Sequence, residues 1–453
     1  MRLCLSESAR IVKGAMTGSD VDFSCVSIDT RSLRPGDLFI AIEGKNVDAH
    51  RFLRKAVEQG AVALIVSQDT DVDLPAIRVA DTRIALGELA REWRKRLAIP
   101  LVGVTGSNGK TSVKEMIAAI LAVDQPVLFT RGNLNNEFGV PLTLFGMNEQ
   151  HRYAVIEMGA NHRGEIAYTA GLALPDVAVI TNAGSAHLEG FGNLEGVASA
   201  KGELVEGLVD SGTAILNADD RFFGFWQQLA RKKRVISFGF TEAAAVRAMD
   251  LEMSRDEQGF LNRFTLFDRD QQAAIGLRLV GRHNIANALA AAAAARALGI
   301  GLEQIKQGLE GMTPVSGRMR PLRGFNGSLL FDDSYNANPS SFAAAIDLIA
   351  QLRGELWVIL GAFAELGDSS AALHEEVGRY AKKHGVKHFF AIGADADKAV
   401  AAFGEGALFF ETQDDLIQAS KILLNADVVC LIKGSRSQNM ERVVLALRSG
   451  EPQ

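Results

Sequence analysis

The chain has 453 residues, which is enough for about three domains of ordinary size. Hydrophobic residues make up 47% and charged residues 23%, as in typical globular proteins, and the net charge of −6 argues against nucleic acid or an anionic membrane as the main partner. The three cysteines form no closely spaced pair, so neither a disulfide framework nor a thiolate metal site is expected. Because no segment has the pattern of a signal peptide or of a membrane-spanning helix, we expect a cytoplasmic protein without membrane insertion.

Residues 1–98 predict a small α/β domain. Short apolar runs predict strands, at residues 26–28, 38–42, 61–66 and 76–79. Residues 82–97 predict an amphipathic helix, and we expect its charged residues, Arg91, Arg94, Lys95 and Arg96, to face solvent. The polar loop of residues 27–32 gathers hydroxyls, an aspartate and an arginine between strands. That composition suits a phosphorylated sugar, although a simple turn explains it equally well.

The strongest functional signal lies in residues 101–121. An apolar run of strand length leads into Thr105-Gly106-Ser107-Asn108-Gly109-Lys110-Thr111, and an apolar stripe at helical spacing follows. A strand, a glycine-rich turn and a helix N-terminus form an anion site, because unpaired backbone N–H groups and the helix dipole converge on the turn. Lys110 adds a charge, and Thr111 offers a hydroxyl to Mg²⁺. Since Val104 stands where the strict phosphate-loop pattern has glycine, we predict a nucleoside triphosphate site of a variant type.

Residues 99–313 as a whole predict a domain built on a buried parallel sheet. Four further apolar runs follow the turn, at residues 153–158, 177–181, 213–216 and 235–238. Parallel sheets bind ligands beyond the carboxyl ends of their strands, where Glu157 and His187 lie in the sequence. Taken singly, Glu157 is explained as well by an exposed loop carboxylate as by a metal ligand. A hydrogen-bonded histidine is the simpler explanation of His187, and a surface lysine is the simpler explanation of Lys201. Residues 246–281 predict antiparallel hairpins, and residues 283–298 a helix.

Residues 314–453 predict a second doubly wound domain. Strand, loop and helix signals recur four times, with strands at residues 329–331, 356–360, 389–392 and 428–432. The segment has no GxGxxG fingerprint, so nothing in it supports a nicotinamide or flavin cofactor.

Taken together and in order, the motifs resemble those of the Mur ligase family. They are TGSNGKT, GNLNNEFGVPL, EMGAN, NAGSAHLEGFG, AKGE, LNADD, GRHNIANALAAAA, DDSYNANPSS and KGSRSQNME. The resemblance runs from about residue 27 to residue 440. It implies three α/β domains: a small N-terminal UDP-sugar-binding domain, a central P-loop-like ATPase domain with a parallel sheet, and a C-terminal Rossmann-like domain. It also implies an ADP-forming ligase of bacterial cell-wall peptide synthesis.

The resemblance implies an ATP site and a magnesium site. The residues from Thr105 to Thr111 would bind ATP, with Lys110 on the β- and γ-phosphates, Asn284 and Asn287 near the adenine, and Asp333 on the ribose. The implied metal ligands are Thr111, Glu157, His187 and Lys201. The implied catalytic residues are Lys110, Glu157, His187 and Lys201. In this family the lysine that Lys201 matches is carbamylated by CO₂, which turns a cation into a carboxylate-like ligand.

The resemblance also implies the substrates, UDP-N-acetylmuramoyl-tripeptide and D-alanyl-D-alanine, joined through an acyl phosphate. The implied substrate-binding residues are Ser27, Thr30, Arg31, Asn133, Asn135, Asn136, Arg318 and Tyr335. We expect a monomer whose C-terminal domain closes over the site. Two alternatives stay open: another amide ligase of the same superfamily, acting on a different muropeptide or on folylpolyglutamate, and an NTPase that is not a ligase.

Two positions depart from the family pattern. Ala362 stands where the family has aspartate in Leu-Gly-Asp-Met, which removes any role of charge at that position. Ala49 replaces the glycine of Asp-Gly-His, and alanine adopts a positive φ poorly.

Overall fold

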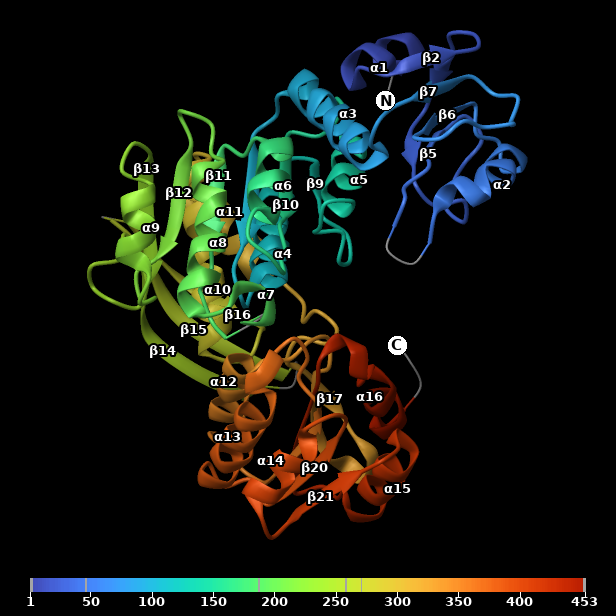
Figure 1. Cartoon of the computed structure of the whole chain (residues 1–453). Helices are drawn as coiled ribbons and strands as arrows, with labels where there is room; N and C mark the ends of the chain where they lie inside the picture. The colour runs from blue at the N-terminus through green and yellow to red at the C-terminus, as the bar shows by residue number, and fades with distance from the viewer. Residues whose placement is uncertain (1–2, 45–46, 186–187, 257–258, 270, 451–453) are drawn as a thin grey trace.

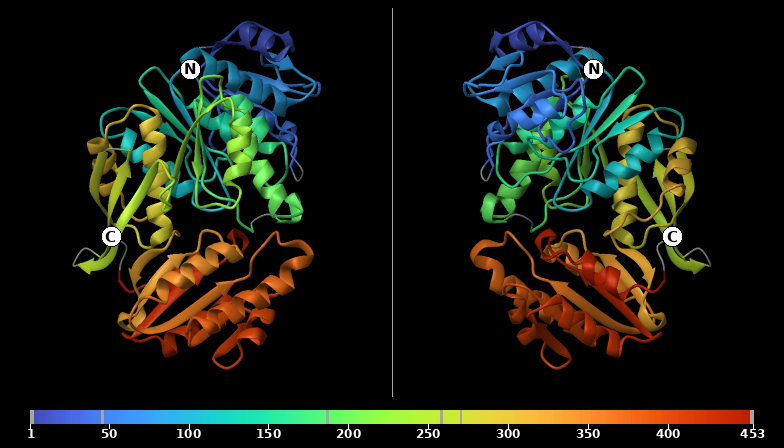
Figure 2. Two further views of the ribbon diagram at one scale, coloured as in Figure 1. Left: turned by 90° about the vertical axis from the view of Figure 1, so that its left-hand side faces the viewer. Right: turned by 90° about the vertical axis from the view of Figure 1, so that its right-hand side faces the viewer.

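The structure is a computed structural model that describes residues 3–44, 47–185, 188–256, 259–269 and 271–450 (Figure 1). Four β-sheets with helices packed on them form an elongated molecule. The N-terminal region, in blue, and the C-terminal region, in orange and red, lie at opposite ends of the central region in all three views (Figures 1 and 2). Within the described residues, no helix combines the length and the apolar character needed to cross a membrane.

The central region is built on a nine-stranded sheet in the order β16-β15-β14-β13-β12-β11-β8-β10-β9. Its strands are β8 (Leu101–Thr105), β9 (Val127–Phe129), β10 (Tyr153–Glu157), β11 (Val177–Ile180), β12 (Thr213–Asn217), β13 (Arg234–Gly239), β14 (Val246–Asp256), β15 (Gly259–Asp268) and β16 (Gln271–Leu277). The strands from β9 to β14 pair in parallel, and β14, β15 and β16 pair antiparallel. The predicted parallel sheet and the predicted hairpins are both confirmed.

The order of this sheet places a binding crevice at β8. The chain continues from β8 to β9 and β10 on one side and then to β11 and β12 on the other side. Such a reversal leaves a crevice beyond the carboxyl ends of the strands, which is where the glycine-rich turn follows β8.

Helices cover both faces of the central sheet. They are α4 (Lys110–Leu121), α5 (Gly139–Phe145), α6 (Glu165–Ala173), α7 (Leu188–Phe191), α8 (Leu194–Glu206), α9 (Phe223–Leu229), α10 (Arg282–Ala297) and α11 (Leu302–Glu310). The predicted apolar stripe of α4 is buried, since Val113, Met116, Ile117, Ile120 and Leu121 are each 0% exposed. The alanine-rich helix α10 packs against α4 within the same core, and its small side chains allow this close approach.

The N-terminal region contains a five-stranded sheet in the order β2-β7-β6-β5-β4 and a two-stranded pair of β1 and β3. The strands are β1 (Leu3–Cys4), β2 (Ala15–Thr17), β3 (Asp22–Phe23), β4 (Val26–Ser27), β5 (Leu38–Ile40), β6 (Ala63–Val66) and β7 (Ala76–Arg78), and the helices are α1 (Leu5–Val12), α2 (Leu53–Glu58) and α3 (Thr82–Leu97). Helix α3 has the predicted bounds, because Asp81 caps its N-terminus by accepting from the backbone N–H groups of Arg83 and Ile84.

The expectation that Arg94 faces solvent is wrong. Arg94 is 5% exposed, whereas Lys95 and Arg96 are exposed as expected. The Arg94 guanidinium donates to the carbonyl of Ala173 at 2.9 Å and forms an ion pair with Asp176 at 3.2 Å. These partners come from a segment that lies far away in the sequence, so the local charge pattern gave no sign of them.

The C-terminal region contains a six-stranded sheet in the order β17-β18-β22-β19-β20-β21. The strands are β17 (Arg320–Arg323), β18 (Leu329–Asp333), β19 (Glu355–Gly361), β20 (His388–Ile392), β21 (Ala407–Phe410) and β22 (Val428–Lys433), and the helices are α12 (Pro339–Ile349), α13 (Ser370–Lys383), α14 (Ala396–Phe403), α15 (Gln413–Leu423) and α16 (Glu441–Leu447). All strands except β17 pair in parallel, which confirms the doubly wound prediction. The proposed boundaries of the three domains, at residues 98/99 and 313/314, remain predictions.

Candidate active site

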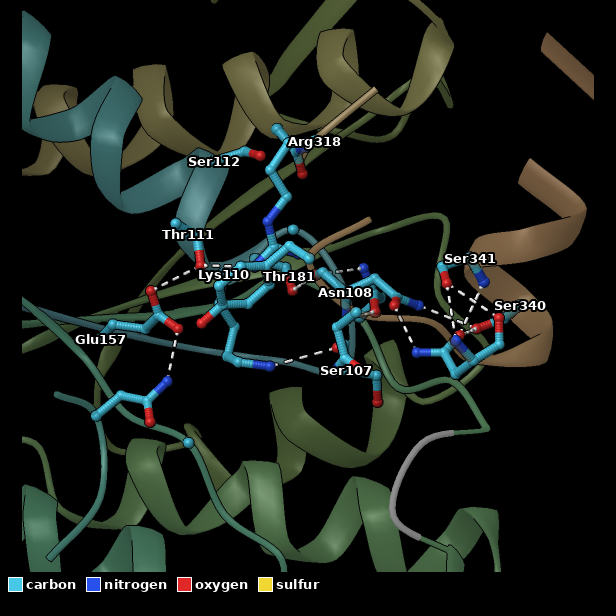
Figure 3. A pocket seen from close by; sticks show the side chains of 18 of the residues that line it. Ser107, Asn108, Lys110, Thr111, Ser112, Glu157, Thr181, Arg318, Ser340 and Ser341 are labelled. Carbon is cyan, nitrogen blue, oxygen red and sulfur yellow. Dashed lines mark hydrogen bonds between the residues drawn. The ribbon is translucent and has the colours of Figure 1, made fainter. Parts of the chain in front are cut away.

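The glycine-rich turn after β8 forms the floor of a cavity of about 880 Å³ (Figure 3). Gly106 and Gly109 have φ angles of 147° and 82°, and a Cβ on Gly106 would lie 1.9 Å from the hydroxyl of Thr181. Only glycine fits this turn, as the phosphate-site prediction requires. The Lys110 ammonium donates to the carbonyls of Gly106 and Ser107 at 2.7 and 3.3 Å. Burial lowers the pKa of Lys110, and the nearby carboxylate of Glu157 opposes this shift.

Two hard oxygen donors meet beside this turn. The Thr111 hydroxyl donates to Oε2 of Glu157 at 3.0 Å, and Oε1 of Glu157 accepts from the side-chain amide of Asn135 at 2.8 Å (Figure 3). Glu157 ends strand β10 and is 3% exposed. A buried carboxylate next to a hydroxyl provides the kind of oxygen ligands that Mg²⁺ binds, so these residues fit the ion. Among the described residues, no group of three or more His, Cys, Asp or Glu side chains is placed to hold a metal.

Of the two other predicted metal ligands, only Lys201 can be located in the structure. His187 lies outside the described residues. Lys201, in helix α8, is 2% exposed, and its Nζ lies 5.2 Å from the centre of the Phe191 ring. Burial, together with the positive charge of Lys110, lowers the pKa of Lys201 to about 7. Lys201 does not line the described part of the cavity.

The residues predicted near the adenine and the ribose line the same cavity. Asn284 and Asn287 lie in the first turns of α10, and their side-chain amides are joined by a hydrogen bond of 3.2 Å. Asp333, at the end of β18, accepts from the Lys433 ammonium at 2.5 Å and from the backbone N–H of Met319 at 3.1 Å. Lys433, which is 2% exposed, was not assigned from the sequence, although it begins the KGSRSQNME motif.

Most of the predicted substrate-binding residues also line the cavity, namely Asn133, Asn135, Asn136, Arg318 and Tyr335. The Arg318 guanidinium lies 4.1 Å from the centre of the Tyr335 ring. It also donates to the Thr111 hydroxyl at 3.2 Å (Figure 3). Ser27, Thr30 and Arg31 are not among the described residues that line it. They lie on and after β4 in the N-terminal region, where the exposed Arg31 side chain pairs with Asp29.

The cavity is closed on one side by contacts between the glycine-rich turn and helix α12. The side chain of Asn108 accepts from Asn338 at 2.8 Å and donates to the Ser340 hydroxyl at 3.0 Å (Figure 3). Asn338 also caps α12, because its side-chain oxygen accepts from the backbone N–H of Ser341. Asn338 and Ser340 were not assigned from the sequence, although both lie in the DDSYNANPSS motif.

The chain matches known proteins over nearly its whole length. Three family models match it: the Mur ligase family catalytic domain over residues 22–94, the Mur ligase middle domain over residues 104–295, and the Mur ligase glutamate ligase domain over residues 317–436. It is 43% identical to the UDP-N-acetylmuramoyl-tripeptide–D-alanyl-D-alanine ligase of Escherichia coli (strain K12). The alignment spans 447 residues and covers 98% of each chain. The chain belongs to the Mur ligase family.

Solved structures resemble this Mur ligase over the same extent. It matches a crystal structure of MurF from Acinetobacter baumannii with a TM-score of 0.92 and 35% identity, over 98% of each chain. It matches MurF from Thermotoga maritima in complex with ADP with a TM-score of 0.83 and 28% identity, over 93% of this chain and 96% of the other. The family resemblance and the three-domain α/β architecture predicted from the motifs are therefore confirmed.

Proposed function

We propose that this Mur ligase is an ATP-dependent, ADP-forming ligase that joins D-alanyl-D-alanine to UDP-N-acetylmuramoyl-tripeptide in peptidoglycan precursor synthesis. The observation that carries the proposal is the 43% identity, over 98% of both chains, to a ligase named for those two substrates. The cavity supports it independently. It brings a glycine-rich anion-binding turn, a buried carboxylate and a loop of asparagines to one place.

The proposed reaction has two steps. In the first, a carboxylate oxygen of the tripeptide attacks the γ-phosphorus of ATP, the bond from that phosphorus to the β-γ bridging oxygen breaks, and ADP leaves with the electron pair. In the second, the amine of D-alanyl-D-alanine attacks the carbonyl carbon, phosphate leaves, and the amine loses a proton. The activation is needed because a free carboxylate carries charge and lacks a leaving group.

Residues of this chain stabilise charge in both steps. Lys110 and the N-terminus of α4 would face the phosphate oxygens, where negative charge gathers, and Arg318 extends a second cation from the C-terminal region toward Thr111. Thr111 and Glu157 would hold Mg²⁺, which neutralises phosphate charge when bound. Asn284, Asn287 and Asp333 would orient the nucleoside, and closure of the C-terminal domain would exclude water from the acyl phosphate.

We further propose that Lys201 is carbamylated. A neutral amine attacks CO₂, a nitrogen–carbon bond forms and a proton is lost. The lowered pKa of Lys201, about 7, supports this because it supplies the neutral amine near neutral pH. Among the described residues, Glu157 is the one carboxylate that bonds Thr111. A carbamate on Lys201 would supply a second anionic oxygen donor for the metal.

The N-terminal loop is proposed to receive the UDP end of the substrate. Ser27 and Thr30 are buried, and Arg31 extends an exposed guanidinium, which is the group best suited to a diphosphate. Arg31→Ala should therefore raise the KM for the nucleotide peptide and leave the KM for ATP unchanged.

We also propose that the enzyme is a monomer, which light scattering after size-exclusion chromatography tests directly.

The deciding experiment measures phosphate release from ATP and Mg²⁺ with the nucleotide tripeptide, with and without D-alanyl-D-alanine. Release only when both substrates are present supports the proposal. Release with neither substrate would indicate an NTPase that is not a ligase. Release with the nucleotide peptide and a different amine, or with a folate substrate, would assign the enzyme to another branch of the superfamily.

A further inference from the structure

Lys114 is a buried lysine that none of the roles described above uses. It lies in α4 one helical turn after Lys110, and its side chain is 1% exposed. Removing an ammonium group from water is costly unless it is paired and hydrogen-bonded. A lysine in this position therefore needs an explanation in terms of what its ammonium contacts.

The ammonium of Lys114 is bound at the point where β9 leads into the asparagine loop. It donates to the backbone carbonyl of Thr130 at 2.7 Å and pairs with Oε1 of Glu115 at 2.7 Å. It also lies 5.5 Å from the centre of the Phe129 ring. Because Glu115 neighbours Lys114 on the same helix, the Thr130 carbonyl and the Phe129 ring are what join Lys114 to another element.

Thr130 is in turn bonded to the strand that ends in Glu157. Its hydroxyl accepts from the backbone N–H of Glu157 at 2.9 Å, and its own N–H donates to the carbonyl of Val155 at 3.1 Å. Beyond Thr130 the chain forms the loop of residues 131–138, from which Asn135 bonds the Glu157 carboxylate at 2.8 Å. Thr130 therefore bonds to the backbone at Glu157 and also begins the loop, so its position affects both.

We propose that Lys114 is a positioning residue for the nucleotide-peptide substrate. By fixing the Thr130 carbonyl, it holds the loop of residues 131–138 so that Asn133, Asn135 and Asn136 face the cavity. An apolar side chain of the same length would avoid the desolvation cost of the ammonium, but it would leave the buried Thr130 carbonyl without this donor. The ammonium therefore serves the placement of the loop through its bond to Thr130.

The test compares Lys114→Met with Lys233→Met. Lys233 is a matched control, because its ammonium also donates to backbone carbonyls, those of Val209 at 2.9 Å and Leu208 at 3.3 Å, and it does not line the described cavity. Each variant is measured in three ways: by thermal unfolding, by KM for each substrate, and by amide hydrogen exchange of residues 130–138.

We expect Lys114→Met to unfold within a few degrees of the wild type, to raise the KM for the nucleotide peptide about tenfold and to exchange faster at residues 130–138. The KM for ATP should change less than about twofold, since the glycine-rich turn keeps its own bonds. Lys233→Met should match the wild type in both KM values and in exchange of that loop. If Lys114→Met does not fold, Lys114→Gln, which is too short to reach Thr130, takes its place.

A wild-type KM and wild-type exchange in the Lys114 variant would overturn the proposal, and so would a KM change shared equally by both substrates. The KM measurement rests on the proposed function, whereas the measurement of amide hydrogen exchange does not. If the wild-type enzyme formed no product from these substrates, the proposed function would fail, and the exchange of residues 130–138 would still decide the role of Lys114.

Discussion

Toward the N-terminal domain, the central domain shares one continuous apolar core, whereas toward the C-terminal domain it presents mainly polar side chains around the cavity. Leu38 and Ile65 of the N-terminal sheet belong to the same buried cluster as Trp93 of α3 and Ile156 of β10. Across the other junction, the polar contacts around the cavity include those of Asn108 with Asn338 and Ser340, and of Arg318 with Thr111.

The polar junction also has an apolar part, in which Phe260 and Val280 of the central domain join the buried cluster of the C-terminal domain. The β14–β15 hairpin extends from the central sheet toward α12, and Phe260 on it packs against Phe331 of β18 with ring centres 5.7 Å apart (Figure 1). The hydrogen bonds beside the cavity are contacts that water or a ligand can replace at little cost. We infer that the N-terminal junction is built for rigidity, and that the C-terminal junction is built to exchange its partners when substrates bind.

The largest effect is expected inside the polar junction, from Glu157→Gln. The amide keeps the shape of the side chain and can still accept from Thr111, but it gives up accepting from Asn135 and loses the charge that would bind Mg²⁺. We expect kcat to fall about 100-fold or more, measured as phosphate release at saturating substrates over a range of Mg²⁺ concentrations. The free energy of unfolding should change by less than about 1 kcal/mol. A near-normal kcat would remove Glu157 from the proposed metal site.

The rigid junction should respond in stability instead, as Trp93→Ala tests. Trp93 is 8% exposed in the shared core, and its indole N–H donates to the carbonyl of Met147 at 3.0 Å. We expect the free energy of unfolding to fall by about 3–5 kcal/mol in urea titrations, because a large cavity opens between two domains. The control is Ile84→Ala on the same helix, 52% exposed, which should cost less than about 0.5 kcal/mol. Equal losses in the two variants would contradict the shared core.

The sequence predicted those structural features of the two junctions that depend on local residue patterns. The glycine-rich turn and the buried stripe of α4 follow from residue spacing, and α3 follows from its amphipathic pattern. Thr111 and Glu157 could be expected to meet, because parallel strands end at the same edge of a sheet. The family motifs indicated which distant residues share the cavity, although their binding roles remain predictions.

Contacts between distant segments could not be predicted in the same way. Nothing near Arg94 in the sequence shows that Asp176 will cover it, nor does the pattern around Lys433 reveal its pairing with Asp333 across the sheet. Edge strands were missed for another reason. Strand β21 carries Leu408 and Phe409 on exposed positions, so its apolar residues do not alternate with polar ones as those of a half-buried strand do.

A smaller effect is expected from pH, through Lys201. Because the pKa of Lys201 lies at about 7, the neutral amine that reacts with CO₂ predominates above that pH and becomes scarce below it. After removal of CO₂, activity should therefore return about tenfold faster one pH unit above the pKa than one unit below it, at equal dissolved CO₂. Lys201→Gln should show no response to CO₂ at either pH. Recovery that is independent of pH would contradict the proposed carbamate.

The smallest effect is expected from Asn338→Asp, which tests whether the polar junction can be opened without unfolding either domain. Asn338→Asp keeps a side-chain oxygen that caps α12, and a negative charge at a helix N-terminus is favourable, so the stability of the C-terminal domain should be unchanged or slightly higher. The substitution removes the amide that donates to Asn108 and places two oxygens opposite each other. The KM for ATP should therefore rise about threefold, and the radius of gyration from small-angle scattering should increase as α12 leaves the turn. If the domains instead stay docked with an unchanged KM, the Phe260–Phe331 contact, and not the polar bonds, holds this junction.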